Sequence, residues 1–230
     1  AWAATFRVAK ARWTPAINRL GHAALAFVPI SAAVLIVLLA GVGNYSPWVR
    51  TPIPAKEGWL NVPFFVVREL ALLGGYWILS LIMVRWSLKC DAKASRDDEI
   101  TDREHFRLSA ISVAVVMGYA VTSTVVSWDF IMSLSPEWFS TMFGTYYFCA
   151  NAYVSLAVII LLMAFLRGPL GIEDFTKPQQ FKDIGNLMLA FALFDMGLFF
   201  AKYLTIWYEN LPEEVGFLIL RYDKGSWPWL

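Results

Sequence analysis

Residues 23–42 read AALAFVPISAAVLIVLLAGV, a run of twenty residues without a single charged side chain. A helix that crosses the hydrocarbon core of a bilayer needs about 20 mostly apolar residues, so this run predicts a membrane-spanning helix. The composition of the whole chain agrees, because 58% of its 230 residues are hydrophobic and 16% are charged, against roughly 25% charged residues in soluble domains. The chain is therefore predicted to be an integral membrane protein.

Four further stretches have the length and apolar character of a spanning helix. They lie at about residues 64–84, 108–132, 138–166 and 184–208. The aromatic run at residues 225–230 is a candidate start of a sixth span, and we expect the chain to continue beyond it. The predicted fold class is an all-α helical bundle in which residues 1–230 form a single, partial membrane domain.

The Lys and Arg residues predict the orientation of the spans, because short cytoplasmic connections carry an excess of these residues. Thirteen of them lie before the first span, between the second and third, and between the fourth and fifth, whereas the alternate connections hold four. The amino-terminal stretch of this segment is therefore predicted to be cytoplasmic. The Trp and Tyr residues near the helix ends are interpreted as interface anchors.

Several kinds of chemistry are not supported by these residues. The two histidines, His22 and His105, are predicted at or beyond the cytoplasmic edge of the membrane, so neither a membrane-embedded haem nor a copper site is expected. The two cysteines, Cys90 and Cys149, are too few for an iron–sulfur cluster. The sequence has no Gly-rich phosphate loop, no GxSxG or HExxH motif and no basic stretch interleaved with aromatic residues. We therefore expect no metal centre, no catalytic side chain and no nucleic-acid partner.

Charged side chains inside the predicted spans are the strongest functional candidates, because an ionisable group in hydrocarbon is costly unless it faces protein, water or a ligand. Arg68 and Glu69 fall in the outer third of the second span, and Asp129 falls near the outer end of the third. In the fifth span, Asp195 lies near the middle of the membrane and Lys202 lies further out. Most of the buried charge is thus predicted to gather in the outer half of the membrane.

Polar side chains recur on one face of three predicted helices. In the fifth span, Asp195, Lys202 and Glu209 are seven residues apart, which places neighbours about 10 Å apart along the helix axis. The third and fourth spans carry polar residues four apart, at Tyr119, Ser123, Ser127 and at Tyr147, Asn151, Ser155. These stripes predict a hydrated half-channel with Tyr147 and Asn151 as relay groups. The competing interpretation is structural, because hydroxyl groups in spanning helices commonly bond to other helices or to the backbone.

Four long runs resemble the NrfD-type family of membrane subunits, which includes the membrane subunit of polysulfide reductase. The runs are WLNVPFFVVR at 59–68, SWDFIMSL at 127–134, WFSTMFGTYYF at 138–148 and IWYENLPEE at 206–214. The resemblance is strongest to the ActF branch, a membrane subunit of bacterial alternative complex III, which is a quinol:electron acceptor oxidoreductase. It extends over nearly the whole chain.

This resemblance implies a larger fold of two four-helix bundles with peripheral helices, of which the present sequence corresponds to a middle portion. It implies a place in the bacterial cytoplasmic (inner) membrane, beside other membrane and periplasmic subunits that hold haem and iron–sulfur clusters. Members of the family bind quinol, either menaquinol or ubiquinol, near the periplasmic side, and ActF-type subunits are proposed to conduct protons. The charges at Asp195 and Lys202 depart from the resemblance, which implies uncharged residues at both positions.

The leading interpretation is a metal-free subunit of alternative complex III, without a redox centre of its own, that conducts protons coupled to quinol oxidation. The expected proton pathway comprises Glu69, Asp129, Asp195, Lys202, Tyr147 and Asn151. Arg68 is expected to be the charge partner of the carboxylates. Two alternatives remain: a purely structural membrane scaffold for haem and iron–sulfur subunits, and a subunit of an ion channel or transporter.

Overall fold

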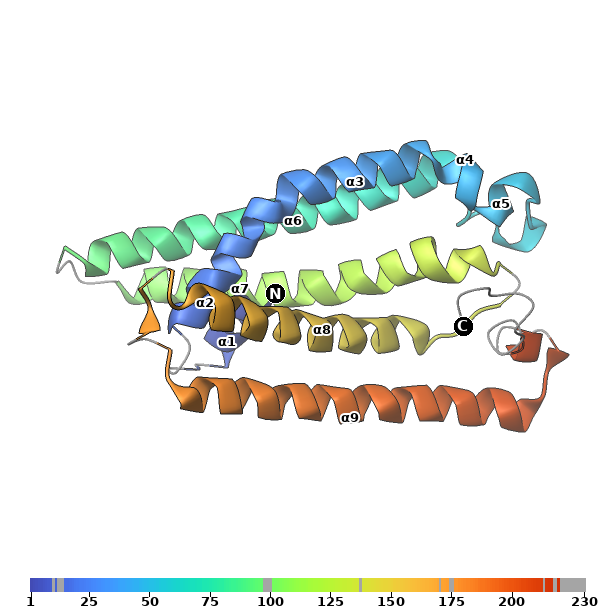
Figure 1. Cartoon of the computed structure of the whole chain (residues 1–230). Coiled ribbons are helices and arrows are strands. Elements are labelled where there is room, and N and C mark those ends of the chain that lie inside the picture. The colour runs from blue at the N-terminus through green and yellow to red at the C-terminus, as the bar shows by residue number, and fades with distance from the viewer. Residues whose placement is uncertain are drawn as a thin grey trace.

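The computed structural model describes residues 1–9, 11, 15–96, 101–136, 138–169, 171–173, 176–212, 214–216 and 219, with residues 15 and 16 described through their backbone alone. Within these ranges, five helices are long and apolar enough to cross a membrane. Figure 1 shows the long helices extending along roughly one common direction. The described residues form helices and turns but no strand. The predicted all-α, multi-pass membrane bundle is therefore confirmed.

Short helices and turns precede and connect the long spans. A short helix, α1 (Trp2–Val8), precedes the first span. The first span consists of α2 (Pro15–Ala23), a 3₁₀ turn (Ala24–Phe27) and α3 (Val28–Ala40). The connection to the second span contains α4 (Val42–Tyr45), α5 (Pro47–Arg50) and a 3₁₀ turn (Pro54–Lys56). The remaining spans are α6 (Val62–Ala94), α7 (Asp102–Val126), α8 (Phe143–Leu166) and α9 (Pro178–Glu209). A π-helical turn (Ser127–Ile131) and a 3₁₀ turn (Met132–Leu134) extend α7.

Three helices are longer than predicted at the end expected to be cytoplasmic. α6 continues to Ala94, α7 begins at Asp102, and α9 begins at Pro178. At 1.5 Å per residue, α6 is about 50 Å long and exceeds a hydrocarbon core of about 30 Å. The charged ends can therefore stay helical outside the membrane, and a capping box between Thr101 and Glu104 fixes the start of α7.

The fourth span begins later than predicted, at Phe143 rather than near residue 138. Trp138 is buried, and its ring meets that of Phe143 edge-on with 5.5 Å between centroids. This segment thus folds back onto the start of α8 instead of extending the helix. The candidate sixth span at residues 225–230 lies outside the described residues.

Consecutive spans pack as neighbours, α6 against α7, α7 against α8 and α8 against α9 (Figure 1). α1 packs against α7 and α2. One apolar cluster contains Leu35 and Leu39 of α3, Trp48 of α5 and Phe65 of α6, and it closes one end of the bundle. This cluster lies beside the second turn of α6, where the predicted charges occur.

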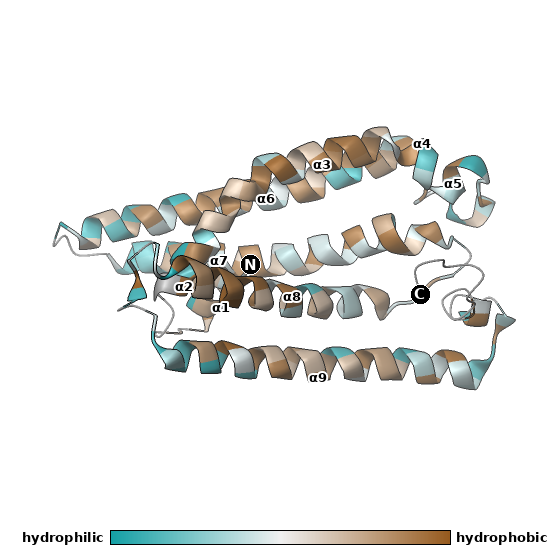
Figure 2. Ribbon diagram, in the orientation of Figure 1, coloured by the Kyte–Doolittle hydropathy of each residue, from teal (hydrophilic) through white to brown (hydrophobic). Residues whose placement is uncertain are grey.

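The spans are rich in apolar residues, which are brown in Figure 2, and hydrophilic residues, in teal, are frequent near several helix ends. Large side chains such as Val37, Met117 and Leu193 are 70%, 61% and 66% exposed. An apolar surface this extensive is unfavourable in water and is suited to lipid contact. The folded chain therefore has the surface of a multi-pass membrane protein.

Candidate functional site

The amino-terminal end of α6 positions two of the predicted charges. Asn61 caps this helix: its side-chain oxygen accepts a hydrogen bond from the Phe64 amide at 2.9 Å, and its amide nitrogen donates to the Glu57 carbonyl at 3.0 Å. Asn is among the strongest N-cap residues, because its side chain satisfies a backbone donor of the first turn. The capped helix places Arg68 and Glu69 in its second turn, where they are 8% and 0% exposed.

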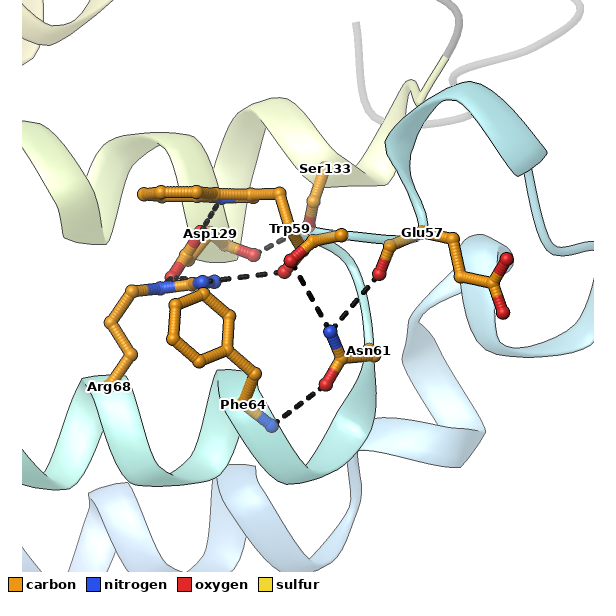
Figure 3. A network of polar contacts seen from close by, with 8 residues as sticks. Glu57, Trp59, Asn61, Phe64, Arg68, Asp129 and Ser133 are labelled. Atoms are coloured by element: carbon orange, nitrogen blue, oxygen red, sulfur yellow. Dashed lines mark hydrogen bonds and ion pairs between the residues drawn. The ribbon is translucent and has the colours of Figure 1, made fainter.

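Asp129 reaches the same place from the π-helical turn that extends α7. The Arg68 Nε donates to Oδ2 of Asp129 at 2.7 Å, and Nη2 lies 2.6 Å from the same oxygen (Figure 3). The two side chains are 7% and 0% exposed. Arg68 and Asp129 therefore form a buried ion pair between two helices, and the predicted charge partner is brought to one of the predicted proton acceptors.

Trp59 contacts both side chains of this ion pair, as Figure 3 shows. Its indole Nε1 donates to Oδ1 of Asp129 at 2.9 Å, and its carbonyl oxygen accepts from Nη1 of Arg68 at 3.3 Å. The guanidinium carbon of Arg68 also lies 4.0 Å from the centroid of the Trp59 ring and 4.6 Å from that of Phe64, within the range of cation–π attraction. The interpretation of Trp residues as interface anchors missed this contact, and no sequence spacing signals it.

Glu69 lies beside this ion pair but outside its hydrogen bonds. Its carboxyl group is an electrostatic neighbour of Asp129 and Arg68. It is nevertheless fully buried, and neither of its oxygens reaches a partner in acceptable hydrogen-bonding geometry within the described part of the chain. Two carboxyl groups thus share one guanidinium group, so a proton on either carboxyl would balance the charge of the site.

Tyr45, at the end of α4, adds a hydroxyl group near Glu69. Burial raises the pKa of the Tyr45 hydroxyl above its ordinary value; the Ser46 hydroxyl opposes this shift in part, and the neighbouring Glu69 carboxyl adds to it. Tyr45 therefore keeps its proton at neutral pH and is available as a hydrogen-bond donor. Sequence reasoning did not select Tyr45, because it lies in a connection and not in a predicted span.

A pocket of about 310 Å³ opens beside the ion pair. Trp59, Trp128 and Trp138 contribute aromatic walls, and Ser133 contributes a hydroxyl group. Trp59 and Ser133 both hydrogen-bond to Asp129, the first at its carboxylate and the second at its backbone carbonyl. A molecule in this pocket would therefore be separated from the buried carboxylate by a single side chain.

Lys202 approaches the same pocket from α9. It is 8% exposed, and its Nζ lies 4.4 Å from the Trp138 ring centroid, 4.9 Å from that of Phe143 and 5.9 Å from that of Tyr146. Aromatic faces thus surround this ammonium group. Trp138 also lines the pocket, so one aromatic side chain links Lys202 to the pocket wall.

The other predicted pathway residues are placed elsewhere. Asp195 is half-buried on α9, its Oδ1 has no hydrogen-bond partner among the described residues, and Cys149 of α8 is an electrostatic neighbour. The Asn151 amide donates to the Tyr147 carbonyl at 2.9 Å, within its own helix. None of these contacts includes Arg68, Glu69 or Asp129, so they do not join these residues to the ion pair.

The two serine hydroxyl groups of the predicted stripe on α7 bond to the backbone. Ser123 donates to the Ala120 carbonyl at 3.1 Å and Ser127 to the Thr124 carbonyl at 2.7 Å, both within the same helix. This arrangement corresponds to the structural interpretation of these side chains.

Comparison of the chain with protein-family models and with curated proteins finds no match.

Proposed function

We propose that this chain is a membrane subunit of a bacterial quinol:electron acceptor oxidoreductase of the alternative complex III type, and that it moves protons released by quinol oxidation. The observation that carries the proposal is the fully buried Glu69 carboxyl beside the Arg68–Asp129 pair, next to an aromatic-walled pocket. Buried ionisable groups in membrane helices commonly serve proton relays or ligand sites. The resemblance of the runs at 59–68 and 127–134 to NrfD-type subunits supports the same function.

In this proposal the pocket receives the quinol head group. Binding sites of this kind combine apolar walls with a few polar groups, and here Ser133 and Lys56 supply polar atoms among the tryptophans. Oxidation of a quinol to the quinone releases two electrons and two protons. Haem or iron–sulfur centres of partner subunits would accept the electrons, one proton would pass toward Asp129 and Glu69, and the other would leave to water at the pocket mouth.

The net charge of the buried Arg68, Glu69 and Asp129 groups favours proton uptake from the pocket. With both carboxyl groups ionised, the site holds one negative charge more than Arg68 neutralises, and burial makes such an excess costly. A proton taken up by Glu69 removes the excess, and its later release restores the receptive state. Lys202, which contacts the Trp138 ring, is proposed to act electrostatically on the occupant of the same pocket. Asp195, Tyr147 and Asn151 are proposed as further members of the pathway.

The proposed location is the bacterial inner membrane with the amino-terminal stretch in the cytoplasm, which would put the pocket on the periplasmic side. The excess of Lys and Arg at the opposite end of the spans supports this orientation. Quinol, as menaquinol or ubiquinol, would then reach the pocket from the outer leaflet, beside the periplasmic subunits that accept its electrons.

The experiment that tests the proposal is Glu69→Gln in the intact complex, with quinol oxidation and proton release measured together. Gln keeps the shape of the side chain and cannot carry a proton, so we expect quinol oxidation to fall about 10²-fold, within the range typical of a lost proton-transfer group. Glu57→Gln is the matched control, because Glu57 lies nearby and is exposed. Normal turnover in a normally assembled Glu69→Gln complex would contradict the proposal.

A second candidate function is a scaffold for the redox subunits. The observation in its favour is that the Arg68–Asp129–Trp59 contacts tie the end of α7 to α6 and to the loop that precedes α6. A scaffold requires this brace but not the proton on Glu69. It predicts that Glu69→Gln lowers the yield of assembled complex and leaves the turnover of each assembled complex unchanged.

A further inference from the structure

At the opposite end of the bundle, a cavity of about 670 Å³ lies among α1, α2, α6 and α7. Its lining includes Arg7, Arg19, His22, Asp91 and His105. Figure 1 shows α1 and α2 toward the end of the bundle where α6 connects to α7. The cavity therefore opens at the end of the spans where Lys and Arg are most abundant.

A second cavity, of about 620 Å³, lies among α1, α7, α8 and α9. Its walls are aromatic and apolar, with Trp2, Phe148 and Phe191 among them. Phe6 and Ala11 line both cavities. The charged cavity at the end of the bundle is thus adjacent to an apolar cavity between the helices, which gives the combined space an amphipathic character.

The charged cavity has an excess of positive charge. Arg19 forms an ion pair with Asp91, whereas Nη2 of Arg7 donates to the neutral hydroxyl of Ser87 at 3.1 Å. Both side chains of the Arg19–Asp91 pair remain accessible, at 49% and 42% exposure, so this guanidinium can bind a second oxygen ligand. The Nδ1 of His22 is buried without a hydrogen-bond partner among the described residues. Two guanidinium groups therefore face one carboxylate in this cavity, and the imidazoles of His22 and His105 line it as well.

We propose that the two cavities together bind one anionic phospholipid. Its phosphate would lie between Arg7 and Arg19 near His22, and one acyl chain would pass Phe6 into the apolar cavity. Guanidinium groups bind phosphate through charge-assisted hydrogen bonds, and basic pockets between spanning helices on the cytoplasmic side are suited to acidic head groups. A free phosphate ion would use the charged cavity alone and would leave the apolar cavity unexplained.

The test measures lipid that remains bound to the purified full chain, by native mass spectrometry after delipidation and exposure to phosphatidylglycerol or phosphatidylcholine. We expect Arg7→Gln and Arg19→Gln each to lower phosphatidylglycerol binding about five-fold, and the double variant about 25-fold. Arg7→Lys keeps the charge and is expected to retain most binding. Arg103→Gln is the matched control, because Arg103 is exposed at the same end and lines neither cavity.

The variant Ala152→Phe tests the apolar cavity. The larger side chain is expected to fill this cavity and to lower lipid binding although Arg7 and Arg19 are intact. Helical content by circular dichroism shows whether each variant has folded. Unchanged phosphatidylglycerol binding in the folded double arginine variant overturns the proposal, as does equal binding of phosphatidylcholine. Full displacement of the lipid by inorganic phosphate, with Ala152→Phe without effect, would instead assign a site for a free anion. These outcomes are independent of Glu69 and of quinol oxidation.

Discussion

Two ion pairs at opposite ends of the bundle have the same chemistry and different surroundings. Arg68 and Asp129 are 7% and 0% exposed, whereas Arg19 and Asp91 are 49% and 42% exposed. The buried pair has lost its water and is surrounded by Trp59 and Phe64, while the exposed pair keeps much of its hydration. The comparison teaches that burial, more than the presence of opposite charges, decides how strongly a pair constrains the fold.

The surroundings also separate what each end can bind. At the buried end, the carboxylate oxygens and the backbone carbonyl of Asp129 already accept hydrogen bonds from Trp59, Arg68 and Ser133, so a small molecule in the neighbouring pocket meets a carboxylate with fixed partners. At the exposed end, Arg7 and Arg19 line an open cavity and can change partners. The first arrangement suits a fixed proton site and the second suits a replaceable ligand.

The largest effect is expected from Arg68→Met, which removes the cation and leaves Asp129 buried beside Glu69. The loss of stability is expected to be about 3–5 kcal/mol, because an uncompensated buried charge remains. Thermal unfolding in detergent measures it. The double variant Arg68→Met with Asp129→Leu should recover most of the loss, and a single variant as stable as the parent would show that the pair does not brace the fold.

An intermediate effect is expected from Trp59→Phe, which keeps a ring but removes the Nε1 donor to Asp129. A hydrogen bond to a charged group contributes about 1.5–3 kcal/mol, so a loss in this range is expected in the same unfolding measurement. Trp128→Phe is the control, because Trp128 is near the same pocket and its Nε1 has no hydrogen-bond partner among the described residues. Equal losses in both variants would assign the effect to ring size alone.

The smallest effect is expected from Asp91→Asn at the exposed end. The pair with Arg19 should contribute about 0–1 kcal/mol, since exposed pairs are offset by hydration and side-chain entropy. Raising the salt concentration should remove the difference between variant and parent, because exposed charges are screened. If Asp91→Asn lost as much stability as Arg68→Met, the exposed and the buried ion pair would not differ in their contribution to the fold.

The spans were predictable because hydrophobicity is local. The run at 23–42 needs no knowledge of distant residues to be recognised as membrane-embedded, and the same holds for the other four spans. Their boundaries were less predictable, since α6 ends later and α9 begins earlier than the apolar stretch, in polar and charged residues that are also helical. Trp138 was assigned to a helix on hydrophobicity, whereas its contact with Phe143 turns the chain back.

The candidate site was predictable in its residues and not in its geometry. Arg68, Glu69 and Asp129 could be chosen as candidates from the sequence because an ionisable side chain within a membrane span is energetically costly. Their assembly depends on a contact between residues 61 positions apart, and on an indole donor that hydropathy treats as an interface anchor. The seven-residue spacing of Asp195 and Lys202 correctly indicated one helical face, but spacing carries no information about which neighbouring helix each side chain meets. Their place in a proton pathway stays a prediction.

The π-helical turn at Ser127–Ile131 has a consequence for how the Arg68–Asp129 pair tolerates a change in chain length. Such a turn holds one residue more than the α-helical repeat, and π-turns of this kind are frequent at functional sites. Deleting one residue within it would restore regular winding, and because the turn itself absorbs the additional residue, the helical register beyond it would be largely kept. Asp129 lies inside the turn, so its side chain would shift relative to Arg68 although the residues on either side of the turn kept their neighbours. The register of a single turn thus decides whether the acid and its guanidinium partner meet.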